Sequence, residues 1–171
     1  MSLDPLVRLA VDSYTHFLSA GKLLPRPSGL PEDLLATRAG AFVTLHKHGR
    51  LRGCIGTIEP AMPCLADEII HNAVSAAFRD PRFPRLTQAE LNDITCSVDV
   101  LGPAEDIRGL AQLDPQVYGV IVSSGFRRGL LLPMLEGVDT AEEQVDIARR
   151  KAGISDREPF SLQRFRVVRH T

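Results

Sequence analysis

The residues best suited to chemistry lie in one short run, LRGCIG at residues 51–56. Glycines inside a strand leave a gap in side-chain packing, so they usually mark a bulge or a close approach by another group. Cys54 lies between two such glycines, and nearby cationic side chains would favour its thiolate, the form that acts as a nucleophile or metal ligand. A free cysteine is also common as a small buried hydrophobic residue. Both interpretations of Cys54 stay open at this point.

Strand alternation places Arg52, Cys54 and Gly56 on one face of the strand, with Gly53 and Ile55 on the other. Arg52 and Cys54 would then form a small anion-binding or thiol-activating pair. We therefore take Cys54 and Arg52 as candidate catalytic residues. A bulge at Gly53 would overturn this assignment of faces.

A second candidate group follows at Asp80 and Arg82, in the stiff segment DPRFPR. The residue before a proline avoids the helical region, and prolines leave little conformational entropy to lose on binding. Asp80 and Arg82 could pair with each other or present charge to a ligand. A solvated loop that ends the preceding helix is an equally good interpretation.

Metal and cofactor chemistry find little support in the sequence. His46 and His48 would share a strand face, but no Cys-x-x-Cys or His-Glu-x-x-His motif accompanies them. The chain also lacks a phosphate loop and a dinucleotide fingerprint. We predict no metal site and no cofactor.

The elements that position these residues follow from periodicity and capping patterns. Apolar residues at helical spacing predict helices over about residues 5–20 and 64–79, and capping boxes at Thr87 and Thr140 predict two more. Alternating or β-branched runs predict strands over residues 41–47, 50–58, 94–101, 117–123, 126–132 and 162–169. In the run 94–101, Cys96 and Val98 should face the core and Asp99 should face outward. Because these elements do not alternate as βαβ units, we predict an α+β fold with a mostly antiparallel sheet of about six strands flanked by about four helices.

Composition narrows the class of protein. The chain has 171 residues, of which 44% are hydrophobic and 24% charged, which fits a single globular domain over residues 1–171 with two sub-lobes. A net charge of −1 argues against a nucleic-acid-binding domain, although seventeen of the twenty basic residues are arginines. No apolar run is long enough for a membrane span. Three cysteines at irregular spacing give no disulfide framework, so we expect reduced thiols and a cytoplasmic location.

Together these motifs resemble the family named after the AMME-syndrome chromosomal region, whose prokaryotic members are called AmmeMemoRadiSam system protein A. The resemblance spans about residue 5 to the C-terminus and rests on FVTL at 42–45, LRGCIGT at 51–57, NA at 72–73, DPRFP at 80–84, LP at 132–133 and KAG at 151–153. It implies a two-lobed α+β fold with a cleft near the LRGCIG strand. It adds Asn72 to the candidate binding residues, beside Gly53, Gly56, Asp80 and Arg82.

The resemblance also implies partners, because such proteins are often encoded beside a Memo-like protein and a radical-SAM protein. Two departures from the family pattern stand out. Tyr118-Gly119 occupies the place where many relatives have His-Gly, and the stretch after Pro133 is short and lacks a tryptophan.

Two hypotheses for function remain. In the first, the protein is an enzyme or modification factor that acts on an unknown small ligand through Cys54 beside Arg52. In the second, it is a non-catalytic module that binds a Memo-like or radical-SAM protein, which would explain why the sequence shows no complete catalytic constellation.

Overall fold

The computed structural model describes residues 3–171, which form two compact units. Unit 1 contains the described residues up to Val100 together with Val168–Thr171, and unit 2 contains Leu101–Val167. The chain therefore leaves unit 1 once, builds unit 2, and returns to unit 1 with its last strand.

Unit 1 is built on a four-stranded sheet, sheet A, in the order β2-β1-β3-β8. Strand β1 pairs antiparallel with both β2 and β3. The elements of this unit are α1 (Pro5–Ala20), α2 (Glu32–Ala36), β1 (Ala41–Lys47), β2 (Arg50–Gly56), α3 (Leu65–Phe78), the 3-10 helix η1 (Gln88–Asp93), β3 (Ile94–Leu101) and β8 (Val167–His170).

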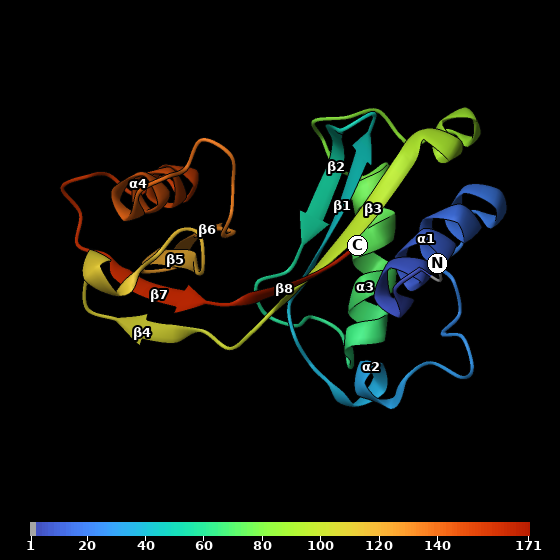
Figure 1. The fold of residues 1–171 in the computed structure, drawn as a ribbon, viewed down its shortest axis with the longest axis horizontal. Coiled ribbons are helices and arrows are strands. Elements are labelled where there is room, and N and C mark those ends of the chain that lie inside the picture. The colour runs from blue at the N-terminus through green and yellow to red at the C-terminus, as the bar shows by residue number, and fades with distance from the viewer. Residues whose placement is uncertain (1–2) are drawn as a thin grey trace. The chain divides into compact units, whose positions relative to one another are not determined.

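Helices α1 and α3 lie on one side of sheet A (Figure 1), and the core of unit 1 fills the layer between them and the sheet. Val43, Leu45 and Val98 point into this core from the sheet and are fully buried. Local signals set the ends of α1: the Asp4 side chain accepts a hydrogen bond from the Leu6 N–H, and Gly21 ends the helix in the left-handed conformation at a φ of 68°.

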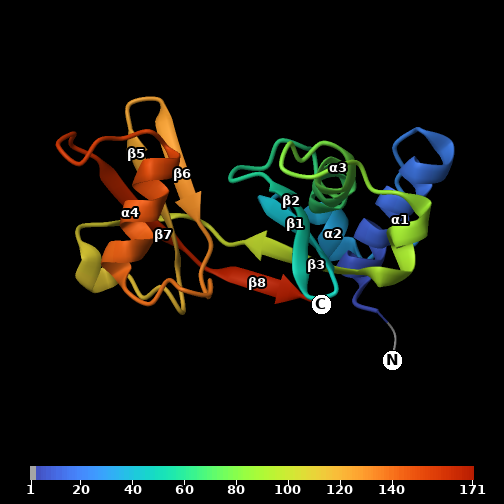
Figure 2. The same ribbon diagram turned by 90° about the horizontal axis from the view of Figure 1, so that it is seen from above.

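Unit 2 is built on a second antiparallel sheet, sheet B, in the order β4-β7-β5-β6. Helix α4 lies along one face of this sheet (Figure 2) and begins at a capping box in which Thr140 and Glu143 exchange hydrogen bonds. The elements of this unit are β4 (Glu105–Ile107), the 3-10 helix η2 (Leu110–Gln112), β5 (Gly119–Ser124), β6 (Arg127–Leu131), α4 (Ala141–Lys151) and β7 (Ser161–Phe165).

The predicted α+β class with antiparallel sheets is confirmed, and the count of strands is corrected. The described residues form eight strands, because β4 was not predicted and the single strand expected over residues 162–169 divides into β7 and β8. The division falls at Arg166, which lies in the chain between the last residue of β7 and the first residue of β8. The Arg166 carbonyl accepts a hydrogen bond from the Gly102 N–H at 2.8 Å. The helix predicted at Thr87 is the 3-10 helix η1.

None of the helices in residues 3–171 combines the length and the apolar character needed to cross a membrane.

Gly53 fixes how closely β2 approaches α3. A Cβ atom at this position would lie 2.2 Å from the backbone carbonyl oxygen of Ala76, far inside van der Waals contact. At Gly109, by contrast, an added Cβ would meet no atom within 4 Å, and the backbone has ordinary extended geometry.

Replacing Gly53 with alanine should therefore lower the free energy of unfolding by about 3 kcal/mol, because two backbone segments must move apart. Gly109→Ala is the matched control and should leave stability unchanged or slightly raised. Urea denaturation of both variants measures the effect, and equal stability of the two would contradict the close approach.

Candidate functional site

A β-bulge in the LRGCIG strand changes which way its side chains point. Thr44 pairs with Cys54 and Leu45 with Gly53, but His46 pairs with Leu51. Arg52 is left without a partner on β1, as happens when one strand carries an extra residue. The strict alternation assumed from the sequence therefore does not extend from Cys54 to Arg52.

Arg52 binds the chain that follows α3. Its guanidinium donates to both carboxylate oxygens of Glu90, each at 3.0 Å, to the Pro84 carbonyl at 2.9 Å and to the Arg85 carbonyl at 3.4 Å. Lys47 also donates to Glu90, at 3.1 Å. With its side chain only 9% exposed, Arg52 is a buried clamp that holds residues 84–90 against β2. This clamp replaces the predicted pairing of Arg52 with the Cys54 thiol, because within residues 3–171 the guanidinium donates its hydrogen bonds to residues 84–90.

Asp80 and Arg82 instead meet the backbone of Cys54. The Cys54 N–H donates to the Asp80 carboxylate at 3.0 Å, and the Arg82 guanidinium donates to the Cys54 carbonyl at 3.2 Å. Arg82 also donates to both carboxylate oxygens of Asp80, at 3.0 and 2.8 Å. Because β2 is an edge strand of sheet A, these side chains satisfy backbone groups that would otherwise be unpaired. We call residues 80–85 the covering segment.

The two side chains of the Asp80–Arg82 ion pair differ in their exposure to solvent. The Asp80 side chain is 2% exposed, whereas that of Arg82 is 55% exposed. The Arg82 guanidinium, helped by the N–H groups of Cys54 and Arg82, holds the pKa of the Asp80 carboxyl well below its usual range. Asp80 is therefore ionised at neutral pH and anchors the segment, while Arg82 presents its outer edge to solvent.

Cys54 is a half-buried residue, and its thiol lies 3.2 Å from the Thr44 hydroxyl. Burial raises the pKa of this thiol above its ordinary value, although the Thr44 hydrogen bond and the Arg82 charge act in the opposite direction. Asp99 and Asp80 raise the pKa further. The sequence suggested cationic activation of the thiolate; in the folded protein the neutral thiol is favoured.

Asp99 was predicted to face outward and is instead buried, with a residue exposure of 1%. It does lie on the strand face opposite Val98, as alternation requires, but it forms a bidentate ion pair with Arg169 of β8 at 2.7 and 2.9 Å. Sequence reasoning missed both Asp99 and Arg169 as neighbours of the thiol, and no local signal links them, because β8 is far away in the sequence.

Asn72 and Gly56 both lie in close contact with other parts of unit 1. Asn72 is buried and donates to the Ala41 carbonyl at 3.0 Å and to the Thr57 hydroxyl at 3.4 Å. A Cβ on Gly56 would lie 2.3 Å from the Phe42 ring. Asn72 therefore connects α3 to the first residue of β1 and to Thr57.

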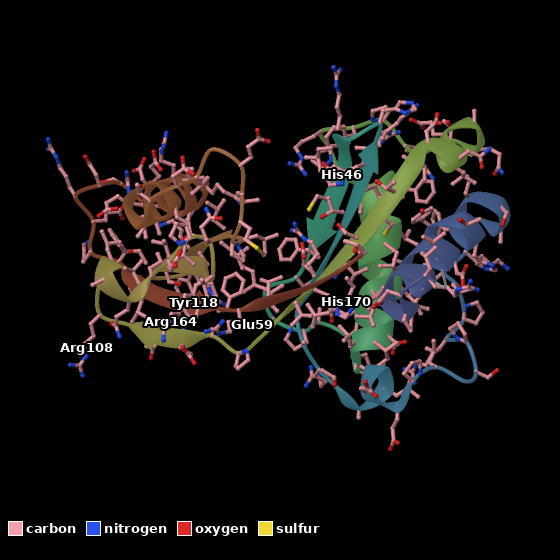
Figure 3. All side chains as sticks on the ribbon, viewed as in Figure 1. His46, Glu59, Arg108, Tyr118, Arg164 and His170 are labelled. Atoms are coloured by element: carbon pink, nitrogen blue, oxygen red, sulfur yellow. The ribbon has the colours of Figure 1, made fainter. Side chains whose placement is uncertain are left out.

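The Tyr118 side chain contacts two arginines in unit 2. The guanidinium carbons of Arg164 and Arg166 lie 4.3 and 4.7 Å from the centre of its ring, and Arg166 donates to its hydroxyl at 3.0 Å. Figure 3 shows Tyr118 and Arg164 together at the same end of sheet B. Histidine has a smaller ring and no hydroxyl beyond it, so the local arrangement depends on tyrosine.

Within residues 3–171, no group of three or more histidine, cysteine, aspartate or glutamate side chains is arranged to hold a metal ion. His46 and His48 thus lie outside any such cluster.

The fold and site together define a class: a two-unit α+β protein in which a bulged, glycine-flanked cysteine strand is covered by a proline-stiffened Asp-Arg segment. The chain belongs to the AMMECR1 family, whose family model matches residues 7–170. This confirms the resemblance drawn from the sequence motifs.

Relatives of different lengths match this sequence, and a solved structure matches its fold. A Thermotoga maritima protein is 51% identical over 168 residues, which cover 97% of both chains. A Clostridium acetobutylicum protein is 47% identical over 98% of this chain, but the match spans only 36% of its own length. The crystal structure of an uncharacterized protein from Pyrococcus horikoshii matches with a TM-score of 0.87 at 32% identity, covering 96% of this chain and 88% of that one.

The raised pKa of Cys54 predicts slow alkylation. At neutral pH, iodoacetamide should react with native Cys54 several times more slowly than with the same thiol in the unfolded chain, because only the thiolate attacks. Thr44→Val should slow the reaction further by removing a hydrogen bond that stabilises the thiolate. Peptide mass spectrometry separates Cys54 from the other two cysteines; native alkylation faster than in the unfolded chain would contradict the prediction.

The Arg52 clamp predicts a pH dependence of stability. Hydrogen bonds from Arg52 above all, and then from Lys47 and Thr87, lower the pKa of Glu90 to about 2 from its ordinary 4.5, against the opposing effect of burial. A carboxylate with a lowered folded-state pKa stabilises the fold fully above pH 4.5 and loses that contribution as the pH falls toward 2. Glu90→Gln should cost about 2 kcal/mol at neutral pH and should flatten the stability profile in that window.

Urea denaturation across this pH range measures the effect. The exposed Glu136, changed to glutamine, is the control and should follow the wild-type profile. Parallel pH profiles for Glu90→Gln and the wild type would show that the clamp does not stabilise the fold.

Proposed function

We propose that this protein is a binding module that recognises a partner protein through the covering segment. The main support for this proposal is that the polar side chains around Cys54 are already hydrogen-bonded within the protein. Residues 80–85 are fixed to β2 by the hydrogen bonds of Asp80, Arg82 and Arg52. What remains for an outside molecule is a rigid surface and not a prepared reaction centre.

The exposed part of this surface has the chemistry of a recognition site. Arg82 is 55% exposed and its guanidinium lies 5.5 Å from the centre of the Phe83 ring. Arg85 is exposed, lies 5.7 Å from the Phe78 ring centre, and has no carboxylate partner among residues 3–171. Arginine and aromatic side chains held rigid are typical of the residues that contribute most to binding energy.

The relatives support a partner that is a protein. The matching sequence makes up almost all of the T. maritima relative but only about a third of the C. acetobutylicum one. A domain that occurs both alone and joined to further polypeptide fits a role beside another protein. The partners implied by the family resemblance, a Memo-like protein and a radical-SAM protein, are the ones to test.

A thiol-based modification activity is the second candidate. It is favoured by the half-buried position of Cys54 and by the Thr44 hydroxyl, which lies 3.2 Å from the sulfur and can orient it. It ranks second because the neutral thiol is favoured and Arg52 is engaged with Glu90.

Reversing the charge of the covering segment should weaken partner binding. Arg85→Glu leaves the Asp80–Arg82 pair intact, and its backbone carbonyl can still accept from Arg52, so the fold should be preserved. We expect affinity for the partner to fall about tenfold, as for an arginine at a binding hot spot. Isothermal titration calorimetry with the Memo-like and radical-SAM proteins of the same genome measures this.

Arg108 provides the matched control, since it projects from unit 2 into solvent (Figure 3). Arg108→Glu makes the same charge change and should bind as the wild type does. Absence of binding by the wild-type protein to either partner, or an equal loss in both variants, would overturn the proposal. Cys54→Ser separates the two candidate functions, since a binding module should tolerate it and a thiol-based enzyme should not.

A further inference from the structure

The turn between β1 and β2 borders a hollow that Cys54 does not line. The hollow has a volume of about 460 Å³ and is lined by Lys47, His48, Arg50, Leu51 and Arg52. His48 and Gly49 both have positive φ, at 50° and 77°, which makes this a tight two-residue hairpin turn. The turn lies at one end of sheet A (Figure 1), and we call this site the hairpin hollow.

The charges around the hairpin hollow do not balance. The single carboxylate of Glu90 is shared by Lys47 and Arg52, at 3.1 and 3.0 Å. Asp93 lies 3.6 Å from His48. Arg50 is exposed and has no carboxylate partner among residues 3–171. Two acidic groups thus face three permanent cations and a histidine, so the hollow retains positive charge.

The shape and lining of the hollow favour a ligand larger than a simple anion. Leu51 is 42% exposed and adds an apolar wall to a cationic site. The volume falls within the usual range for binding pockets and exceeds what one carboxylate needs. A peptide segment that carries acidic side chains next to an apolar one matches the positive charge of the hollow, its apolar Leu51 wall and its volume.

We propose that the hairpin hollow binds an acidic segment of the partner protein, with Arg50 as the main contact for its carboxylates and Leu51 as the contact for a neighbouring apolar side chain. This rests on the proposed function in one respect, namely that the partner is a protein. The hollow and the covering segment both adjoin β2, so a single partner can engage both.

The direct test uses a synthetic peptide with the sequence Glu-Leu-Glu-Glu-Leu and a control peptide in which glutamine replaces each glutamate. The wild-type protein should bind the acidic peptide and not the glutamine peptide, with chemical-shift changes confined to the β1–β2 turn in NMR spectra. Arg50→Glu should weaken this binding about fivefold, and Leu51→Ser should weaken it to a lesser degree. Arg108→Glu is the control for the same charge change far from the turn and should bind as the wild type does.

The outcomes separate this inference from the proposed function. If Arg85→Glu weakens partner binding but Arg50→Glu weakens neither the partner nor the peptide, the hollow is not the acidic-segment site and the inference fails alone. If neither full-length partner binds but the acidic peptide still binds in an Arg50-dependent way, the proposed partners fail and the hollow stands. Equal binding of the acidic and glutamine peptides would overturn the inference directly.

Discussion

The attachment of residues 80–90 to strand β2 is the constraint on which the rest of the site depends. A buried carboxylate is stable only when its donors are in place together, and Asp80 takes its donors from Arg82 and from the Cys54 backbone. Ten residues later, Glu90 is held by Arg52 in the same way. Strand and segment are therefore held against each other by the contacts of these two carboxylates.

The bulge explains why this attachment needs the residue types of the LRGCIG motif. By leaving the ladder at Arg52, the strand turns a long guanidinium toward carbonyls that a residue in regular register would not meet. Gly53 then lets the strand lie against the backbone of α3. Cys54 is different, because its backbone makes the essential contacts and, within residues 3–171, the Thr44 hydroxyl is the hydrogen-bond partner of its sulfur. No contact of the sulfur explains why this position is a cysteine and not a serine.

The same interactions determine where binding energy can come from. Groups already satisfied inside the protein, such as Asp80 and Arg52, have little left to offer a partner. Arg50 and Arg85 have no carboxylate partner among residues 3–171 and carry uncompensated charge at the surface of unit 1. The proposed recognition of an acidic protein surface rests on this division between anchoring and presenting groups. The LRGCIG motif therefore resembles a catalytic site in sequence, while the folded protein favours the neutral form of the Cys54 thiol.

The sequence by itself determined the features encoded within a few residues. The Asp4 cap, the Gly21 stop, the Thr140 capping box and the alternation of β3 were all predictable, because each depends on near neighbours. Only the tertiary structure decided that Arg52 clamps Glu90, 38 positions away, and that Asp99 is buried by Arg169, 70 positions away. Such pairs depend on which strands become neighbours and on a bulge that shifts the register, and residue spacing carries no record of either. For the same reason the last strand was predicted as one and is two, since its residues pair with two different sheets.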